Sequence, residues 1–257
     1  MHVIVFGELM QLPPVEGLKV FKASVWKLFH PIFLRQPHRQ TNDKFFRILN
    51  KSWFGIVDDE VRYTLEERWR QYNPEHVMWN TTYLSSLRDE AAALNHAVLS
   101  GMPAGNPIFV SKAEDFENGR ERANGSIGVI TNLLPDDEVE AAFPTKDGIQ
   151  VMNLHKTPSY FQINGVEYKR VQLPIINAFA LTIHKVQGLS LLAVTVALNS
   201  NIFSDGQAYV VLSRGKDLEQ VYLTHCDLEP IKADPEAIAE YEKLEAKAEQ
   251  LNTPHSH

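Results

Sequence analysis

The sequence predicts an α/β protein, and three observations lead to that prediction. Two short runs, residues 3–6 and 193–198, are wholly apolar, as strands buried on both faces of a parallel sheet are. In several other segments, apolar residues recur at helical spacing. Residues 106–175 differ from both, because short β-type runs alternate there with turn pairs. This pattern predicts a small antiparallel β insert within the α/β body.

The first apolar run ends at Gly7 and leads into the rigid, extended loop Leu12-Pro13-Pro14-Val15. A buried parallel strand needs neighbours on both sides, and almost no chain precedes this one. We therefore expect either that the chain begins in the middle of a domain or that this strand lies at an edge.

Four helices are expected before the insert, a short one over 24–29 and longer ones over 43–51, 59–72 and 86–99. Each longer segment has apolar residues that align on one helical face. They are Phe45, Ile48 and Leu49 in the first, Val61, Leu65, Trp69 and Tyr72 in the second, and Leu87, Ala91, Leu94 and Val98 in the third.

The insert and the C-terminal part are marked by turn and cap residues. The β-type runs are 108–110, 127–131, 160–163 and 168–173, and the turn pairs are Asn124-Gly125, Asp147-Gly148 and Asn164-Gly165. Helix and strand alternate again from Phe179. Asp234-Pro235 predicts the start of a last helix, with Asp as N-cap and Pro at the first helical position. Its apolar stripe is sufficient to dock it on the body: Ile238, Tyr241, Leu244, Ala248 and Leu251.

Charge is unevenly distributed along the chain, although the net charge is −7. Residues 17–51 carry eight lysines and arginines against one acid, Asp43, and residues 226–257 carry eight acids against three lysines. We expect that a polyanion could bind the first stretch while the acidic tail stays solvated. The alternative is a basic surface that has no ligand.

Several classes of protein are excluded by composition. A single cysteine, Cys226, excludes an internal disulfide and suits a reducing compartment. No run of about 18 apolar residues predicts a transmembrane helix, and the N-terminus lacks the basic start of a signal peptide. The histidines show no metal-ligand spacing with cysteine, so no metal site is predicted.

Two candidate phosphate-binding clusters lie in the N-terminal part. Glu8 and Gln11 follow the first apolar run, at the carboxyl end of the expected strand, where ligands of open α/β sheets bind. A neutral amide there can orient water or sense a γ-phosphate. The second cluster, residues 35–40, holds Arg35 and Arg39, whose planar donors suit phosphate oxygens. The competing interpretations are a proline-stiffened turn with a surface glutamine and a solvated basic loop.

Two further clusters lie after the insert. In residues 180–188, Thr182 can cap a short helix that Gly188 ends, and its hydroxyl, His184 and Lys185 form a surface that could track phosphates. In residues 204–214, Ser204 and Gln207 have capping-box spacing, which places Arg214 at or just past the end of a helix. An arginine held there can reach a γ-phosphate across a domain boundary. Taken singly, the histidine would be structural and the arginine a surface residue.

Two weaker signals concern metal and phosphate binding. Asp58-Asp59-Glu60 could bind magnesium, but acids at a helix start are commonplace and we favour that interpretation. The sequence contains no Gly-x-x-x-x-Gly-Lys-Ser/Thr, so it contains no phosphate-binding loop of the P-loop type.

In order along the chain, these clusters resemble the later motifs of the Pif family of superfamily 1 helicases, including the Pif-like helicases of Helitron transposons. The resemblance covers residues 3 to about 223. The best matches are Gln11-Leu12-Pro13-Pro14-Val15, Thr182-Ile183-His184-Lys185 with Gln187-Gly188, and Gly206-Gln207-Ala208-Tyr209-Val210 with Leu212-Ser213-Arg214.

The resemblance implies a RecA-like P-loop NTPase fold, the second motor domain of such a helicase, with an SH3-like β-barrel insert and the first RecA-like domain largely missing. The implied domains are a remnant of the first RecA-like domain at 1–33, the second RecA-like domain at 34–105 and 176–230, the barrel at 106–175, and an acidic helix and tail at 231–257.

The resemblance also implies residue roles and partners. Gln11 would sense the γ-phosphate, Arg39 and Arg214 would contact it from the second domain, and Glu8, Gln187 and Gly188 would lie at the nucleotide. Thr182, His184 and Lys185 would touch the DNA backbone. The expected ligands are ATP, Mg²⁺ and single-stranded or forked DNA, and a further partner could be a missing N-terminal half. The family implies a nuclear or mitochondrial address and work in DNA repair, recombination or telomere maintenance.

The chain departs from the family pattern in three ways. Glu8 stands where Asp is usual, and Val186 replaces a usual Ser. Most seriously, the phosphate loop and the acidic magnesium-binding motif are absent from the sequence, and electrostatic stabilisation supplies nearly all catalysis in phosphoryl transfer. We therefore expect the isolated chain to be incapable of ATP hydrolysis. Three hypotheses stay open: part of a longer helicase, a non-catalytic module that binds single-stranded DNA or a partner, and a transposon-derived remnant.

Overall fold

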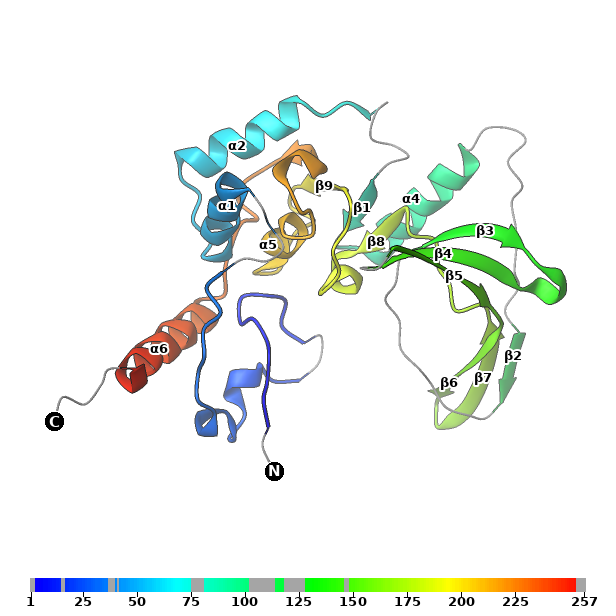
Figure 1. Cartoon of the computed structure of the whole chain (residues 1–257), viewed down its shortest axis with the longest axis horizontal. Helices are drawn as coiled ribbons and strands as arrows, with labels where there is room; N and C mark the ends of the chain where they lie inside the picture. The colour runs from blue at the N-terminus through cyan, green and yellow to red at the C-terminus, as the bar shows by residue number, and fades with distance from the viewer. Residues whose placement is uncertain are drawn as a thin grey trace. The chain divides into compact units, whose positions relative to one another are not determined.

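The computed structural model describes residues 3–14, 17–36, 40, 42–74, 81–101, 114–117, 128–145 and 148–252 (Figure 1). Within these ranges, nothing is described of the side chains of 114–117, 144–145 and 251–252. The chain divides into two compact units. Unit 1 comprises Met1–Leu94 and Phe179–His257, and unit 2 is the intervening Asn95–Ala178.

Unit 1 is built on a four-stranded parallel sheet with strand order β10-β9-β1-β8. The strands are β1 (Thr82–Ser85), β8 (Ala180–Thr182), β9 (Val194–Leu198) and β10 (Val221–Cys226). β9 is central, and Val194, Val196 and Leu198 are buried in it. The apolar run at 193–198 is therefore a buried parallel strand, as its composition predicted.

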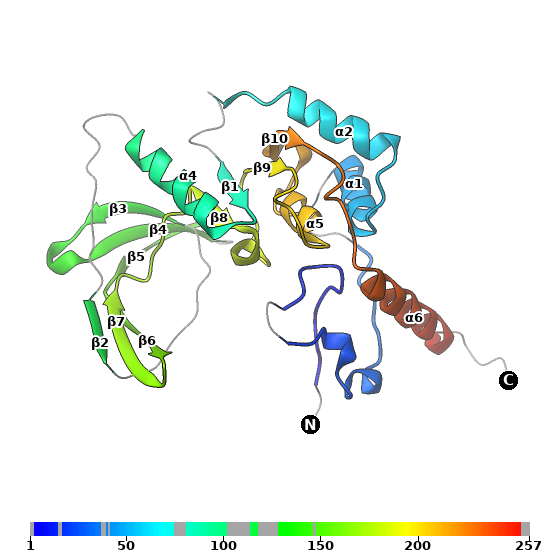
Figure 2. The same cartoon turned by 180° about the vertical axis from the view of Figure 1, so that it is seen from behind.

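Two helices before the sheet bury the faces that their spacing predicted. α1 (Asp43–Trp53) buries Phe45, Ile48 and Leu49, and α2 (Asp59–Arg70) buries Val61 and Leu65. α1 packs against α2 and α5 (Gln207–Leu212), and α2 packs against β10 (Figure 2). Two residues of the predicted apolar faces are more exposed: Trp69, near the end of α2, is 46% exposed, and Leu87, just before α4, is 43% exposed.

The remaining helices of unit 1 are short, apart from α4 and α6. Four 3₁₀ turns occur in the described part of this unit: η1 (Val20–Lys22), η2 (Trp26–Leu28), η4 (Ile183–Val186) and η5 (Leu218–Gln220). The short helix expected at 24–29 is thus one 3₁₀ turn. α4 (Arg88–Ser100) runs from unit 1 into unit 2.

The acidic residues at the start of α2 act on the helix and on a nearby lysine. The Asp58 carboxylate accepts a hydrogen bond from Val61 N at 3.0 Å and so caps α2. It also lies 2.6 Å from Lys51 Nζ, which is equally close to Glu60. These contacts agree with the interpretation of the acidic run as a helix start.

The first apolar run does not form the buried strand that we expected. Residues 3–6 are assigned to no helix or strand, and Ile4 and Phe6 are 77% and 82% exposed. A strand forms by pairing its backbone with a neighbour. The described strands of unit 1 pair only with one another, and none of them pairs with this run. The buried-strand prediction is wrong for the described chain.

The last helix, α6 (Pro235–Asn252), is capped and docked as predicted. Asp234 Oδ1 accepts hydrogen bonds from Glu236 N at 2.9 Å and Ala237 N at 3.4 Å. Tyr241 then packs edge-on against the rings of Trp53 and Phe33, with centroids 4.8 and 5.1 Å apart. One aromatic side chain therefore fastens α6 to two segments of unit 1.

Unit 2 contains two antiparallel three-stranded sheets, with orders β2-β7-β6 and β3-β4-β5. The strands are β2 (Glu114–Glu117), β3 (Val129–Leu133), β4 (Val139–Thr145), β5 (Gly148–Leu154), β6 (Thr157–Ile163) and β7 (Val166–Gln172), and η3 (Pro135–Asp137) joins β3 to β4. The prediction of an antiparallel insert is confirmed. The Asn164-Gly165 pair forms the β6–β7 turn, with φ of 52° and 81° as its composition requires. The run 108–110 and the pair Asn124-Gly125 lie outside the described residues.

Candidate functional site

The side chain of Gln11 is held between two others. Its Nε2 donates to Glu8 Oε2 at 2.5 Å, and its Oε1 accepts from Gln187 Nε2 at 3.2 Å. The flanking Met10 and Leu12 are 2% and 7% exposed, so they anchor the loop in the core. A loop pinned on both sides of Gln11 presents its carboxamide in a defined direction.

Gly206 brings the loop of Gln11 against the start of α5. Its φ is +77°, and a Cβ at this position would lie 2.4 Å from the carbonyl oxygen of Met10. Its amide donates to Lys232 O at 2.9 Å. Only glycine permits both the left-handed backbone and this close approach. Two clusters almost 200 residues apart in sequence are therefore in contact.

Helix α5 begins with half of the expected capping arrangement. Gln207 Oε1 accepts from Ser204 N at 3.1 Å and from Phe203 N at 3.0 Å, as the second residue of a capping box does. The N-cap position itself belongs to Gly206 and not to Ser204. Gly206 takes the N-cap position because the backbone there is left-handed and lies close to the carbonyl oxygen of Met10.

Around the predicted DNA-contacting residues, apolar side chains fix a one-turn helix. Ile183 and Val186 of η4 are fully buried, whereas His184 and Lys185 between them are exposed. Thr182 occupies the N-cap position, but its side chain makes no capping hydrogen bond. Gly188 has φ +84°, two residues past the end of the helix. The geometry thus points two polar side chains outward from a rigid turn.

Arg214 follows α5, as expected, but its guanidinium is buried and only 1% of the residue is exposed. Nη1 donates to Leu189 O at 2.9 Å and to Val186 O at 3.3 Å. Nε donates to Val210 O at 2.8 Å, and Nη2 donates to Ser213 Oγ at 2.8 Å. The arginine therefore ties α5 to residues 186–189, which we call the coupling loop.

The coupling loop joins the predicted site residues. Gln187 binds Gln11 from one side, and Arg214 holds the carbonyls of Val186 and Leu189 from another. His184 and Lys185 directly precede the loop in sequence. Arg39, which we expected to complete the site, lies outside the described residues. Its contact with phosphate, like that of Arg214, stays a prediction.

Part of the basic stretch is paired with the acidic tail, which the charge pattern did not indicate. Lys19 contacts Asp234 and Glu236, and Lys22 Nζ lies 2.9 Å from Glu236 Oε1. The hydrogen bonds that Glu236 accepts from these lysines lower its pKa to about 2. The hydrogen bonds that Lys19 donates to Asp234 and Glu236 raise the pKa of Lys19. Several carboxylates of the tail, which we expected to be only solvated, therefore also take part in long-range pairs.

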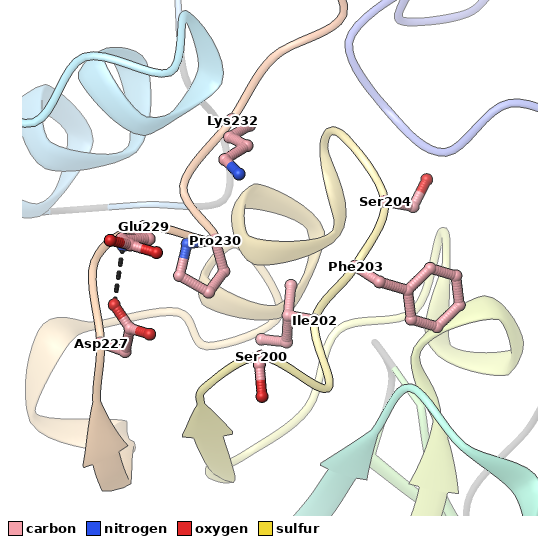
Figure 3. Close-up of a pocket in the computed structure, with 8 residues that line it drawn as sticks. All are labelled: Ser200, Ile202, Phe203, Ser204, Asp227, Glu229, Pro230 and Lys232. Atoms are coloured by element: carbon pink, nitrogen blue, oxygen red, sulfur yellow. Dashed lines mark hydrogen bonds between the residues drawn. The ribbon is translucent and has the colours of Figure 1, made fainter.

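A pocket that the sequence did not indicate lies beside the start of α5 (Figure 3). Its volume is about 200 Å³, and its wall includes Ser204, Asp227, Glu229 and Lys232. Asp227 Oδ1 accepts a hydrogen bond from Glu229 N at 3.0 Å. The carboxylates and the lysine give the pocket mixed charge. Its residues come from separate segments, so no local motif marks it.

Neither a metal site nor a membrane span is found in the part of the chain that the structure describes. No group of three or more His, Cys, Asp or Glu side chains in the described ranges is arranged to hold a metal ion. In the same ranges, no helix has the length and apolar character needed to cross a membrane.

Comparison with known proteins gave no match to a family model but several similar proteins. The chain is 26% identical over 306 residues to the ATP-dependent DNA helicase PIF6 of Trypanosoma brucei brucei, covering 94% of this chain and 38% of that protein. It is 26% identical over 280 residues to human ATP-dependent DNA helicase PIF1, covering 95% of this chain and 43% of that protein. The chain thus spans less than half the length of these curated relatives.

Solved structures of Pif1 helicases have the same fold. The Candida albicans Pif1 helicase aligns with a TM-score of 0.70 at 21% identity, covering 93% of this chain and 67% of that one. Pif1 helicase from Bacteroides in complex with ADP-AlF3 and ssDNA aligns at 0.67 and 22% identity, covering 93% of this chain and 65% of that one. The parallel sheet of unit 1 is accordingly that of a RecA-like domain. Sequence relatives and fold agree along nearly the whole chain, and both are Pif helicases, which this chain resembles.

Proposed function

We propose that the chain provides the second motor domain of an ATP-dependent 5′–3′ DNA helicase, which couples ATP hydrolysis to movement along single-stranded DNA. The observation that carries the proposal is the coupling loop. Gln187 of this loop is hydrogen-bonded to Gln11, and two of its carbonyls accept hydrogen bonds from Arg214. The loop directly follows the exposed His184 and Lys185. A nucleotide-sensing group and a DNA-facing helix are thereby attached to one short segment.

On the nucleotide side, the chain offers a sensor wall. Gln11, oriented by Glu8 and Gln187, would face the γ-phosphate beside Gly188. Arg214 would support this wall and, with Arg39, reach the phosphate from the second domain. ATP supplies the phosphoryl group whose loss drives stepping. The sequence has no phosphate loop, and the described residues form no Mg²⁺-binding group, so Mg²⁺ would be held by other residues.

On the DNA side, Thr182, His184 and Lys185 would contact the phosphate backbone. The buried Ile183 and Val186 fix the turn, which limits the entropy lost when the polar side chains bind. Such contacts position the strand without reading its sequence. Single-stranded or forked DNA is the proposed partner, as it is in the names of the solved Pif1 structures.

Other features of the proposal rest on the resemblance. We assign the second RecA-like domain to 34–105 and 176–230, with an SH3-like insert at 106–175, a remnant of the first domain at 1–33 and an acidic tail at 231–257. A nuclear or mitochondrial address, and a role in DNA repair, recombination or telomere maintenance, belong to the same proposal. A separate polypeptide could supply the first motor domain.

The test of DNA binding is a titration of labelled oligo-dT with the chain over a series of salt concentrations. His184→Ala with Lys185→Ala should weaken binding about ten-fold at low salt and reduce the salt slope by roughly 0.7 for each phosphate interaction that the substitutions remove. Arg62→Ala is the control, because it removes an exposed cation on α2, a helix that carries none of the proposed site residues. Absence of binding by the unaltered chain at low salt would overturn the proposal.

A non-catalytic module that binds single-stranded DNA is the second candidate, favoured by the missing phosphate loop. Both candidates predict DNA binding, and neither predicts hydrolysis by the chain alone. Addition of a Pif-type first motor domain separates them, since DNA-stimulated turnover should appear only if the chain is half of a motor. Turnover by the isolated chain that Gln11→Ala abolishes would contradict the view that it supplies one wall of the nucleotide site.

A further inference from the structure

The segment before α1 is a basic arm that contacts acidic residues of α6. Residues 18–36, here called the basic arm, contain Lys19, Lys22, Lys27 and Arg35 and no aspartate or glutamate. The charge-bearing side chains of the arm are of the type that binds phosphate. α6 carries five glutamates and two lysines over its 18 residues. The two segments therefore have opposite net charge.

Ion pairs join both ends of the basic arm to α6. Near the start of α6, Glu236 is bound by Lys19 at 2.8 Å and by Lys22 at 2.9 Å. Between two and three turns further on, Arg35 Nη2 lies 2.8 Å from Glu245 Oε1. The carboxylates of α6 thus pair with three of the four cations of the arm.

Contacts other than ion pairs also hold the two segments in register. Trp26 Nε1 donates to Glu240 Oε1 at 2.8 Å, and Lys247 Nζ donates to Phe29 O at 3.1 Å. The rings of Phe33 and Tyr241 pack edge-on 5.1 Å apart. The basic arm follows α6 for most of the helix, so the contact is extended and not a single surface pair.

The ion pairs remain open to solvent and to other anions. The side chains of Lys22 and Arg35 are 46% and 65% exposed, and that of Glu236 is 53% exposed. Exposed pairs of this kind contribute little to stability and are screened by salt. A polyanion that binds the same cations gains from the release of its condensed counterions, which a helix carboxylate does not. DNA phosphates can therefore compete with the carboxylates of α6 for the arm.

We propose that α6 competes with the phosphate backbone of single-stranded DNA for the basic arm, so that Lys19, Lys22 and Arg35 bind either carboxylates of α6 or DNA phosphates. DNA bound at the proposed surface of His184 and Lys185 would displace α6 carboxylates from the arm and gain further contacts. The proposal extends the proposed function but concerns a different set of side chains.

The test compares binding of labelled oligo-dT by the full chain and by Glu236→Gln with Glu245→Gln. The substitution keeps side-chain size and removes the two α6 charges that pair with Lys22 and Arg35, while Asp234 still pairs with Lys19. We expect about five-fold tighter binding at low salt and a salt slope steeper by about 1.4, from two or more newly available phosphate contacts. The matched control is Glu229→Gln with Glu242→Gln, which changes net charge equally at exposed positions outside the contact. It should alter affinity less than about two-fold.

Two further measurements make the result decisive. Adding Lys22→Gln and Arg35→Gln to the tighter-binding variant should cancel its gain, because the cations that DNA would use are then absent. In the unaltered chain, saturating oligo-dT should speed amide hydrogen exchange in 235–250. An equal gain in the control pair, no gain in the test pair, or exchange in α6 that DNA leaves unchanged would each overturn the proposal. If only the His184 and Lys185 variants change affinity, the proposed function stands and this inference fails.

Discussion

The carboxamides of Gln11 and Gln187 are hydrogen-bonded at 3.2 Å, although 176 residues separate them in sequence. Gln187 stands in the coupling loop, and Arg214 fixes that loop through carbonyls on either side of Gln187. A movement of the Gln11 side chain therefore acts on Gln187 and, through it, on the coupling loop that Arg214 holds in place. Such a connection between the proposed nucleotide and DNA surfaces can be tested without catalytic activity.

The contact between Gln11 and Gln187 should appear as a coupling energy in a double-mutant cycle. We expect Gln11→Ala and Gln187→Ala to show a coupling of about 0.5–1 kcal/mol in the free energy of unfolding, the range of a partly exposed neutral hydrogen bond. Urea denaturation of the two single variants, the double variant and the parent measures it. Gln162→Ala, in unit 2, should give additive effects with Gln11→Ala. Additivity of the Gln11 and Gln187 substitutions would show that the bond contributes nothing.

Arg214→Ala should destabilise unit 1 by about 3 kcal/mol or more. The substitution leaves the carbonyls of Val186 and Leu189 without their buried donor and opens a cavity where the side chain was. Arg214→Lys should also lose about 2 kcal/mol, because an ammonium group cannot reproduce the planar fork. Urea denaturation is the measurement, with Arg62→Ala as a control expected within about 0.5 kcal/mol of the parent. A loss below about 1 kcal/mol for Arg214→Ala would contradict the buried arrangement.

Gly206 and Gly188 form a matched pair that separates backbone strain from steric conflict. Their φ angles are +77° and +84°, but only Gly206 faces another atom, Met10 O at 2.4 Å from an added Cβ. Gly188→Ala should therefore cost only the left-handed backbone, about 1 kcal/mol. Gly206→Ala should cost about 3 kcal/mol or more and displace the loop of Gln11. Equal losses of thermal stability would show that Met10 moves aside freely.

The parts of the fold that local patterns specify could be predicted. The spacing of Phe45, Ile48 and Leu49 indicated the buried face of α1, and the run 193–198 indicated the central strand β9. β1 was missed, because its four residues contain too few apolar positions to show a period. Residues 3–6 were predicted as a strand because composition alone cannot show whether a pairing partner exists.

The candidate site could be predicted as a set of residues but not as a geometry. Motif order identified Gln11, Gln187 and Arg214, whereas the inward turn of Arg214 depends on carbonyls that approach only in the folded chain. Charge patterning found the basic arm and the acidic tail. It could not show that Lys19 and Glu236, 217 residues apart, bind each other. Contacts between distant segments are set by packing, which no local pattern contains.

The contact of Lys19 and Lys22 with Glu236 should make the stability of the packing of α6 on unit 1 depend on pH in the acid range. Hydrogen bonds from the two lysines lower the pKa of Glu236 from 4.5 to about 2. A carboxyl whose pKa is depressed in the folded state contributes its stability above the unfolded pKa and loses it as pH falls. The loss should therefore begin near pH 4.5 and be complete near pH 2.

Carbon-13 NMR of the Glu236 carboxyl group measures this pKa directly. Lys19→Gln with Lys22→Gln should raise it towards 4.5, because both donors that stabilise the carboxylate are removed. Lys27→Gln is the control, since it removes a cation of the same arm for which no contact with Glu236 is found among the described residues. A Glu236 pKa near 4.5 in the unaltered chain would mean that the lysines do not hold this carboxylate in solution, and the contact of the basic arm with the start of α6 would then be absent.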